Sequence, residues 1–380
     1  MKPLAILCMF VSVVAHAQPP TTELGGYAKY LFSSITDSPA GNSVDHLVHA
    51  RLNSKWFPVE SFSANMELRF RGYYGETVEK TPQFAGTLKN RSVYGNLDAT
   101  IWSGRKTLGY GEIDRLYINW APRDWQVTLG RQRIAWGTNL VWNVIDVFNP
   151  LSVLDFDYEE RPAVDAIHVQ YYTSEVTKIA VAYAPKTETS KSIAGLLWTL
   201  NRWNYDFHMA VGERYGLNYA GLGWAGDIAG GGFRGEGLLS EMPDVVTGEP
   251  GPGTMFSAAL SGDYTFTNTF YLHTELLFNS KGVTSNAAVF RIIAQKLHLL
   301  SPSRWSLFQE VSYDLTPLVR GSAFVILNPD DNSVVLVPSV TWSAITNFDI
   351  TAIALLFSGD TGSEFGSLGR AVYLRGKLSM

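Results

Sequence analysis

The chain has 380 residues, of which 46% are hydrophobic, 17% charged and 13% aromatic. This composition excludes a disordered chain, and the charged fraction is lower than the roughly 25% of soluble globular domains. The formal net charge of −5 argues against nucleic-acid binding, because contacts to phosphates need a basic surface.

The first 17 residues predict a cleaved signal peptide. Lys2 precedes an apolar run over 4–14, and Ala-His-Ala at 15–17 is a cleavage site, so the mature chain is expected to begin at Gln18. The alternative is a membrane anchor, but the run is shorter than the ~18 residues of a spanning helix. Cys8 is the only cysteine, so the expected mature chain has no disulfides, zinc–thiolate sites or thiol nucleophiles.

The rest of the chain contains segments in which apolar and polar residues alternate. The clearest lie at 46–55, at 62–74 and over the last ten residues. No later apolar run approaches the ~18 residues of a spanning helix. Alternation fits two classes of protein: a soluble β-sandwich, and a transmembrane β-barrel whose alternate residues face lipid and lumen.

Three further features favour the barrel. Tight turns at 58–61, 122–124, 267–268 and 346–347 contrast with long segments at 76–109, 138–163, 187–203 and 280–302, as in outer-membrane barrels. Aromatic residues lie near the ends of predicted strands, where membrane interfaces would lie. The sequence also ends on an alternating strand, although its last residue is Met380 rather than the usual aromatic.

The strand count is ambiguous. Seventeen candidates can be found, but single-chain bacterial barrels have even counts, and seventeen puts the turn at 267–268 on the wrong side. One over-read or missed strand between 204 and 240 would repair both faults. The Gly-rich run there favours an over-read, so we predict an all-β, transmembrane antiparallel β-barrel of about 16 strands over 18–380, with 18 strands next.

The segment 138–163 is the most distinctive loop. It is too apolar to lie free in water, so we expect it to fold inward against the barrel wall and narrow the pore. The alternative is a loop packed over the barrel mouth, with its acids solvated. The residues expected to form the constriction or contact solute here are Trp142, Asp146, Asp155, Asp157, Glu159 and Glu160.

The predicted lumen face of the first strands is basic. Its residues are Arg51, Lys55, Arg69, Arg71, Arg115, Arg131 and Arg133, and barrel closure would add Arg375 and Lys377. Later strands carry Glu236, Glu275, Glu310 and Asp314 inward. Facing arginines and an acidic loop would set ion selectivity across a constriction. Alternatively, the charges pair across strands and fill a packed lumen. One conflict remains in the strand of Arg131 and Arg133. If both point inward, alternation places the polar Gln132 on the lipid-facing side, unless a β-bulge intervenes.

Other motifs fail on their context. Gly230, Gly232 and Gly235 match a dinucleotide-binding pattern, but no helix pattern follows them. His46 and His49 would lie on opposite faces of a strand, which argues against a metal site. The three histidines His168, His208 and His273 are only weak candidates for a dispersed hydrolase site. No cofactor or metal is therefore expected.

One region resembles a known family. The segment 130–137 (GRQRIAWG), Trp142-Asn143, the Phe-Asn-Pro at 148–150 and the segment 160–165 (ERPAVD) resemble porin-like outer-membrane barrels related in style to alginate-export and phosphate-selective porins. The resemblance extends to individual residues over about 130–172, and elsewhere it is limited to the strand pattern of a barrel. It implies a barrel with this loop after a Gly-Arg-Gln strand, and it supplies no substrate or functional residue.

The predicted function is a porin-like channel for small polar or ionic solutes. It would lie in the Gram-negative outer membrane, in contact with the lipid bilayer and lipopolysaccharide, and would bind no nucleic acid. One alternative is a component of an export or uptake system for hydrophobic or polymeric solutes. Others are a barrel enzyme of the outer membrane and a soluble secreted β-protein. The sequence leaves open a homo-oligomer or an envelope transport partner.

Overall fold

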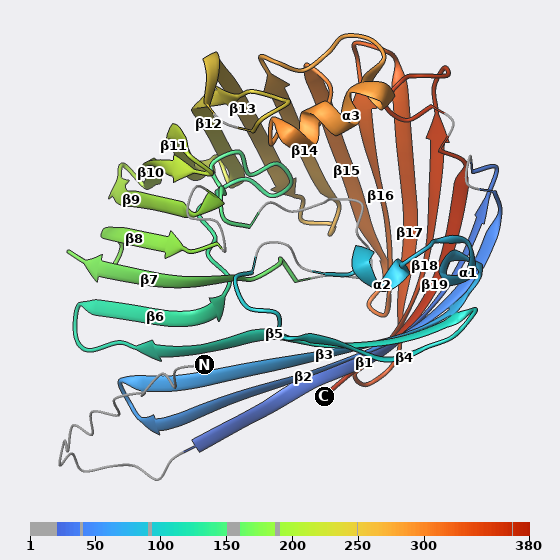
Figure 1. Ribbon diagram of the computed structural model, residues 1–380, viewed down its shortest axis with the longest axis horizontal. Coiled ribbons are helices and arrows are strands. Elements are labelled where there is room, and N and C mark those ends of the chain that lie inside the picture. Colours follow the sequence, from blue (N-terminus) through green and yellow to red (C-terminus); the bar gives the residue numbers. More distant parts are fainter. Residues whose placement is uncertain are drawn as a thin grey trace.

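The described residues of this computed structural model, 21–38, 41–89, 93–149, 160–186, 191–248, 250–366 and 368–380, are mostly β-structure (Figure 1). The predicted signal peptide lies outside these residues. The first nine strands are β1 (Thr21–Thr36), β2 (Ser43–Val59), β3 (Phe62–Gly75), β4 (Asp98–Ser103), β5 (Thr107–Trp120), β6 (Trp125–Gln132), β7 (Val164–Tyr172), β8 (Lys178–Ala184) and β9 (Ile193–Arg202).

The second half of the chain supplies ten more strands and the longest described helix. The strands are β10 (Tyr205–Arg214), β11 (Leu217–Ile228), β12 (Gly231–Pro243), β13 (Pro250–Thr265), β14 (Tyr271–Asn279), β15 (Trp305–Thr316), β16 (Val319–Asn328), β17 (Ser333–Ile345), β18 (Phe348–Ser358) and β19 (Arg370–Ser379). The helices are α1 (Glu76–Lys80), α2 (Phe84–Thr87) and α3 (Ala287–Lys296). None of these described helices is long and apolar enough to cross a membrane.

The strands close into an antiparallel barrel. β1 pairs with β2 on one side and with β19 on the other, from Tyr27–Ser379 to Thr36–Arg370. Eighteen strands form the closed wall, and β4 lies outside it, hydrogen-bonded to β5 alone. The prediction of sixteen strands is therefore wrong, and the second choice of eighteen is confirmed.

The error comes from a missed strand rather than an over-read one. The prediction of a loop over 187–203 is wrong, because β9 occupies Ile193–Arg202. Its inward residues Ile193 and Leu197 are buried in an apolar cluster, and its outward residues Leu196 and Trp198 are also apolar. A strand that is apolar on both faces loses the alternation that marks the other strands.

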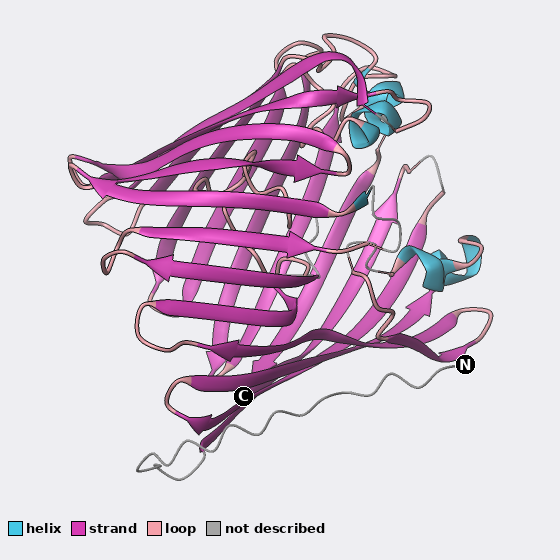
Figure 2. Cartoon of the chain, turned by 60° about the vertical axis from the view of Figure 1, so that its left-hand side comes forward, coloured by secondary structure: helices cyan, strands magenta, loops and turns pink. Residues whose placement is uncertain are grey.

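The two ends of the barrel differ, as turn lengths predict. Figure 2 shows short turns at one end and the helices at the other. With β9 counted, the turns between β2 and β3, β5 and β6, β13 and β14, and β17 and β18 all lie at the short end. In outer-membrane barrels the short turns face the periplasm, so we call the short end periplasmic and the other end extracellular.

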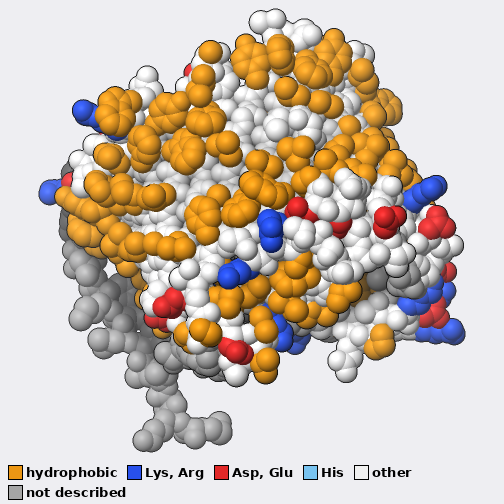
Figure 3. Space-filling view, turned by 90° about the horizontal axis from the view of Figure 1, so that it is seen from above, with side chains coloured by type: hydrophobic (Ala, Val, Ile, Leu, Met, Phe, Trp, Pro, Cys, Tyr) orange, Lys and Arg blue, Asp and Glu red, His pale blue; other side chains and the backbone are white. Residues whose placement is uncertain are grey.

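The outer face of the wall is apolar. In Figure 3, apolar side chains cover much of the face in view, with charged side chains scattered among them and a group at the right-hand edge. Exposed tryptophans stand at strand ends next to the periplasmic turns: Trp56, Trp120, Trp125 and Trp203. Indole rings at this level match the interfacial girdle of a membrane barrel.

A clamp holds the outside strand β4 to the barrel. The Arg131 side chain donates to Asp165 Oδ1 at 2.8 Å and to the backbone oxygens of Ile113 and Gly95. Asp165 Oδ2 accepts from the backbone nitrogens of Tyr94 and Gly95, each at 2.8 Å. The segment that enters β4 is thus tied to β5, β6 and β7 at once.

Breaking this clamp should destabilise the barrel. Arg131→Ala is expected to lower the free energy of unfolding by about 2 to 4 kcal/mol, because it leaves the half-buried Asp165 without its cation. Arg320→Ala is the control, since its pair with Asp314 has a similar 2.9 Å contact but side chains 49% and 36% exposed, against 5% and 21% for Arg131 and Asp165. The exposed pair is expected to contribute at most ~1 kcal/mol. Urea unfolding measures both, and equal losses would contradict the clamp.

Candidate functional site

The chain enters the barrel interior where β6 ends at Gln132. We call residues 133–149 the lumen loop (Figure 1). Its first and last parts form one apolar cluster with inward-facing side chains of β7 to β11. The cluster members are Ile134, Trp136, Val147, Phe148, Val164, Ala166, Ala180, Ala182, Ala184, Ile193, Leu197, Ala210 and Tyr219. This burial places the loop against the wall that the short strands form.

The middle of the lumen loop packs against other strands. Val141, Trp142, Val144 and Ile145 lie in a second cluster with Leu277 of β14, Phe308 of β15 and further residues of β16 to β19. The Trp142 ring lies edge-on to Phe308, with centroids 6.3 Å apart. Trp142 is thus buried within the packing, which removes it from any path open to solute.

Two inward-facing glycines make room for the loop. A Cβ atom at Gly195 would lie 2.8 Å from the Trp136 ring, and one at Gly221 would lie 2.8 Å from Ile145 Cγ2. Side chains larger than hydrogen would collide with the loop at both positions. The Gly-rich stretch that suggested an over-read strand is therefore partly clearance for the lumen loop.

Two buried carboxylates fix the backbone of the lumen loop. Glu236 of β12 accepts from the backbone nitrogens of Thr138, Asn139 (2.8 Å) and Ile145 (3.0 Å). Glu275 of β14 accepts from those of Val141 (3.1 Å) and Trp142 (2.6 Å). Hydrogen bonds to a carboxylate are stronger than neutral ones, and a buried N–H without a partner is costly.

Asp146 joins the lumen loop to the returning chain, by which we mean residues 160–163, which lead into β7. Its side chain is fully buried and accepts from Arg161 Nη1 at 2.8 Å and from the Asn149 backbone nitrogen at 3.3 Å. Burial raises the pKa of Asp146 to about 7, against the opposing effect of Arg161. The carboxyl therefore titrates near neutral pH.

A raised pKa gives stability a defined pH dependence. The folded protein holds the Asp146 proton more tightly than the unfolded chain, so this contribution is complete below pH 3.8 and is lost as pH rises to about 7. Relative to Asp146→Asn, which keeps an oxygen for Arg161, the wild type should lose up to about 4 kcal/mol across this window. Urea unfolding of both proteins at pH 4, 5.5 and 7.5 checks this. A constant difference would contradict the raised pKa.

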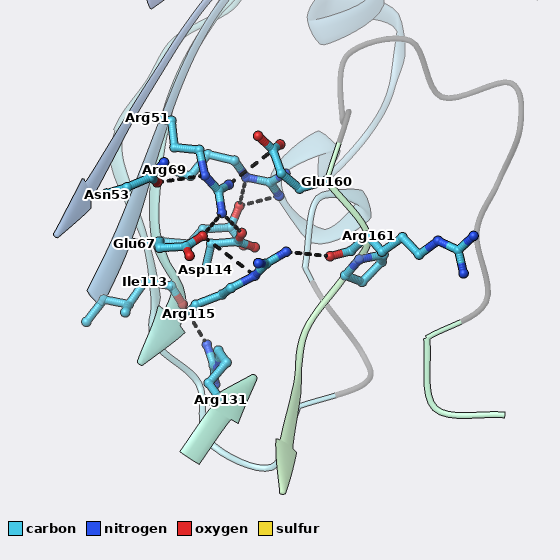
Figure 4. A network of polar contacts seen from close by, with 12 residues as sticks. Arg51, Asn53, Glu67, Arg69, Ile113, Asp114, Arg115, Arg131, Glu160 and Arg161 are labelled. Atoms are coloured by element: carbon cyan, nitrogen blue, oxygen red, sulfur yellow. Dashed lines mark hydrogen bonds and ion pairs between the residues drawn. The ribbon is translucent and has the colours of Figure 1, made fainter. Parts of the chain in front are cut away.

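Opposite the lumen loop stands the charged wall, which we define as Arg51, Arg69, Arg71, Glu67, Glu112 and Asp114. Figure 4 shows four of them, Arg51, Glu67, Arg69 and Asp114, with Arg115 and Glu160 beside them. Arg51 binds Glu67 and lies 2.6 Å from Asp114 Oδ2. Arg69 and Arg71 share Glu112, at 2.5 and 2.9 Å. Three cations thus meet three anions, so the wall carries little net charge.

The returning chain contacts the charged wall. Glu160 accepts from the Tyr27 hydroxyl at 3.2 Å and lies 3.7 Å from Arg51. Arg115 donates to the Arg161 backbone oxygen at 3.4 Å and lies 3.6 Å from Glu67. The segment that leaves the lumen loop therefore bridges the interior towards β1, β2 and β5.

On the periplasmic side the lumen contains a polar chamber of about 400 Å³. Its lining includes the amides of Asn65, Asn119, Gln126, Gln132 and Gln170, together with Lys55, Arg115, Arg133 and His168. Arg133 is exposed, and it has no ion-pair partner among the described residues. No described residue that lines the chamber carries a carboxylate.

The structure corrects several expectations for individual residues. Arg131 points away from the lumen, because its ladder partner is Leu116 on the outer face, and Gln132 takes the inward position. Trp142 and Asp146 are buried in the packing rather than facing a pore. The acids Asp155, Asp157 and Glu159 lie outside the described residues.

Sequence reasoning missed the acids of the charged wall. Glu112 and Asp114 were hidden because strict alternation with Arg115 puts both on the outer face. A register shift between Glu67 and Leu68 in the β3–β5 pairing brings Asp114 and Arg115 inward together. The Glu-Ile-Asp-Arg run at 112–115 was the available signal, since its three charges are improbable on a lipid-facing strand.

The histidines lie in ordinary polar surroundings. His273 has Glu275 and Glu310 at 3.5 and 3.7 Å, His208 contacts the Trp136 backbone oxygen, and His168 lines the chamber. Among the described residues, no group of three or more His, Cys, Asp or Glu side chains could hold a metal ion.

Comparison with known proteins identifies the fold. No protein-family model and no curated protein matches the sequence. Similar solved structures include OccAB2 of Acinetobacter baumannii, with TM-score 0.62 and 7% identity over 94% of this chain and 98% of that one. OprD of Pseudomonas aeruginosa has TM-score 0.56 and 10% identity over 98% and 97%. OmpF of Salmonella typhi has TM-score 0.51 and 10% identity over 94% and 97%.

Identities this low establish shared architecture alone. The predicted porin-like barrel is thereby confirmed as a fold, while the finer likeness to alginate-export and phosphate-selective porins stays a prediction. The chain has the fold of the outer-membrane porins.

Proposed function

We propose that the protein is an outer-membrane channel for small polar or ionic solutes. The observation that carries this proposal is the lumen loop, which Glu236 and Glu275 hold inside an eighteen-stranded barrel across from the charged wall. Such a loop narrows the interior without filling the polar chamber. The constriction then lies between the lumen loop and the charged wall.

Ion preference would arise in the chamber rather than at the charged wall. The predicted basic face is largely neutralised, since each of Arg51, Arg69 and Arg71 meets a carboxylate. In the chamber, by contrast, the lining holds Lys55, Arg115 and Arg133 but no carboxylate. Arg115 lies 3.6 Å from Glu67 of the charged wall, and Arg133 has no ion-pair partner among the described residues. A net positive lining lowers the barrier for anions and raises it for cations.

The alternative of an export or uptake system for hydrophobic or polymeric solutes would need aromatic side chains of the lumen loop to be available to solute. Trp142 and Phe148 are 4% and 1% exposed, so neither can contact a passing solute. The lining of the chamber is instead rich in amides, which form hydrogen bonds with polar solutes. These observations favour polar solutes.

Planar-bilayer conductance of the refolded mature protein tests the proposal. We expect discrete conductance steps and a reversal potential that favours anions under a salt gradient. Heat-modifiable migration on a gel verifies that the barrel is folded. A folded barrel that gives no steps would refute the channel and favour a plugged or enzymatic barrel.

A further inference from the structure

A groove runs along the outer face of the wall, between β4 and the strands β1, β2, β3 and β5. Its volume is about 600 Å³. The barrel side of the groove carries Ala28, Ala50, Leu52, Leu68 and Phe70. The β4 side carries Leu97, Ala99 and Ile101.

The groove exists because small residues meet across neighbouring strands. Ala28 is paired with Ala50 in the β1–β2 ladder, and Gly111 with Ala99 in the β4–β5 ladder. Beside them Trp102 lies over Gly109, where a Cβ atom would come within 2.4 Å of the indole. The small side chains of the wall and the side chains of β4 that stand above them together form the groove.

The groove lies at the depth of the membrane hydrocarbon. Ala50 and Leu52 are near the middle of β2 and belong to its outward-facing set. Apolar cavities do not retain water, so in a bilayer this groove would be filled by hydrocarbon. A second barrel presents a broad convex wall, which would leave the depression partly empty.

Basic residues lie above the groove. The β4–β5 turn carries Arg105 and Lys106, whose side chains are 86% and 43% exposed and share the single carboxylate of Glu79. At 3.4 Å per residue and a strand tilt near 40°, this turn lies ~13 Å closer to the membrane surface than Ala99. The ~25 Å apolar band of a membrane barrel extends about half that far, or ~13 Å, above its middle. A turn ~13 Å above a residue at mid-depth therefore lies at the level of the lipid head groups.

We propose that the groove binds lipopolysaccharide of the outer leaflet, with an acyl chain between β4 and the barrel and a lipid phosphate at Arg105 and Lys106. Apolar walls suit the chain, and two cations that share one carboxylate suit a phosphate. The proposal rests on the outer-membrane location proposed above and not on channel activity. A loss of lipid retention would therefore refute this proposal, whereas a loss of conductance would refute the channel.

Native mass spectrometry of the refolded full barrel tests the proposal, with purified lipopolysaccharide as the probe. Wild type is expected to retain one lipopolysaccharide molecule through detergent exchange. Ala50→Trp fills the groove and should reduce retention at least tenfold. Ala220→Trp is the matched control, because Ala220 is an exposed residue of β11 remote from the groove, and it should retain lipid as wild type does.

A second pair of variants tests the phosphate site. Reversing Arg105 and Lys106 to glutamate should also reduce retention at least tenfold. The matched control reverses Lys281 and Arg304, two exposed cations of the β14–β15 connection, and should retain lipid. Undiminished retention in either test variant would overturn the proposal. Retention of phosphatidylglycerol equal to that of lipopolysaccharide would also overturn it. So would lipid-free oligomers that Ala50→Trp dissociates, because they would assign the groove to a second copy of the chain.

Discussion

Replacing Glu236 and Glu275 together by alanine is expected to raise single-channel conductance severalfold. The two carboxylates accept five backbone hydrogen bonds from residues 138–145, so the double variant removes the partner of five N–H groups, four of them in buried residues. Each unpaired buried donor costs ~1 to 3 kcal/mol, so the double variant strongly weakens the attachment of the lumen loop to the wall. The lumen loop should then leave its position, and current should pass through a wider and noisier path.

The control for this variant lies on the same strand. Glu241 of β12 accepts hydrogen bonds from Asn218 and does not touch the lumen loop, so Glu241→Ala should leave conductance unchanged. Gel migration with and without heating must show folded barrels in every case. If the double variant is folded and conducts like wild type, the lumen loop is not the constriction.

Replacing Arg115 and Arg133 together by serine should move the reversal potential towards cation preference. Both arginines line the polar chamber, and among the lining residues only Lys55 would then supply cationic charge there. Removing two charges from a confined lining changes the local potential strongly, because the low-dielectric walls focus the field. Measurement under a tenfold salt gradient gives the shift directly, and lower ionic strength should enlarge it.

Arg131→Ser is the matched control for the charge prediction. It removes the same charge two residues from Arg133, but on the outer face beside Asp165. The variant is expected to lose stability and to keep its ion preference. If Arg131→Ser moves the reversal potential as far as the chamber variant does, ion preference is not set in the chamber.

Local patterning determined the class of fold. Alternation at 46–55, at 62–74 and over the last ten residues, with unequal turns, was enough to predict a closed antiparallel barrel. These signals are visible in sequence because lipid on one side and polar groups on the other impose a period of two along each strand. The need to bury Val141, Trp142, Val144 and Ile145 likewise followed from their chemistry alone.

Only the tertiary structure decided the features in which two elements share a surface. β9 escaped prediction because the lumen loop covers its inner face and makes that face apolar. Asp114 and Arg115 both point inward because of a register shift, which no residue type announces. The arginines of the first strands were recognisable as inward-facing, but their neutralisation by Glu67, Glu112 and Asp114 depends on side chains that meet across the ladder. Period, charge and apolar content are properties of a single segment, whereas strand count, ion pairing and the outside position of β4 depend on which segments become neighbours.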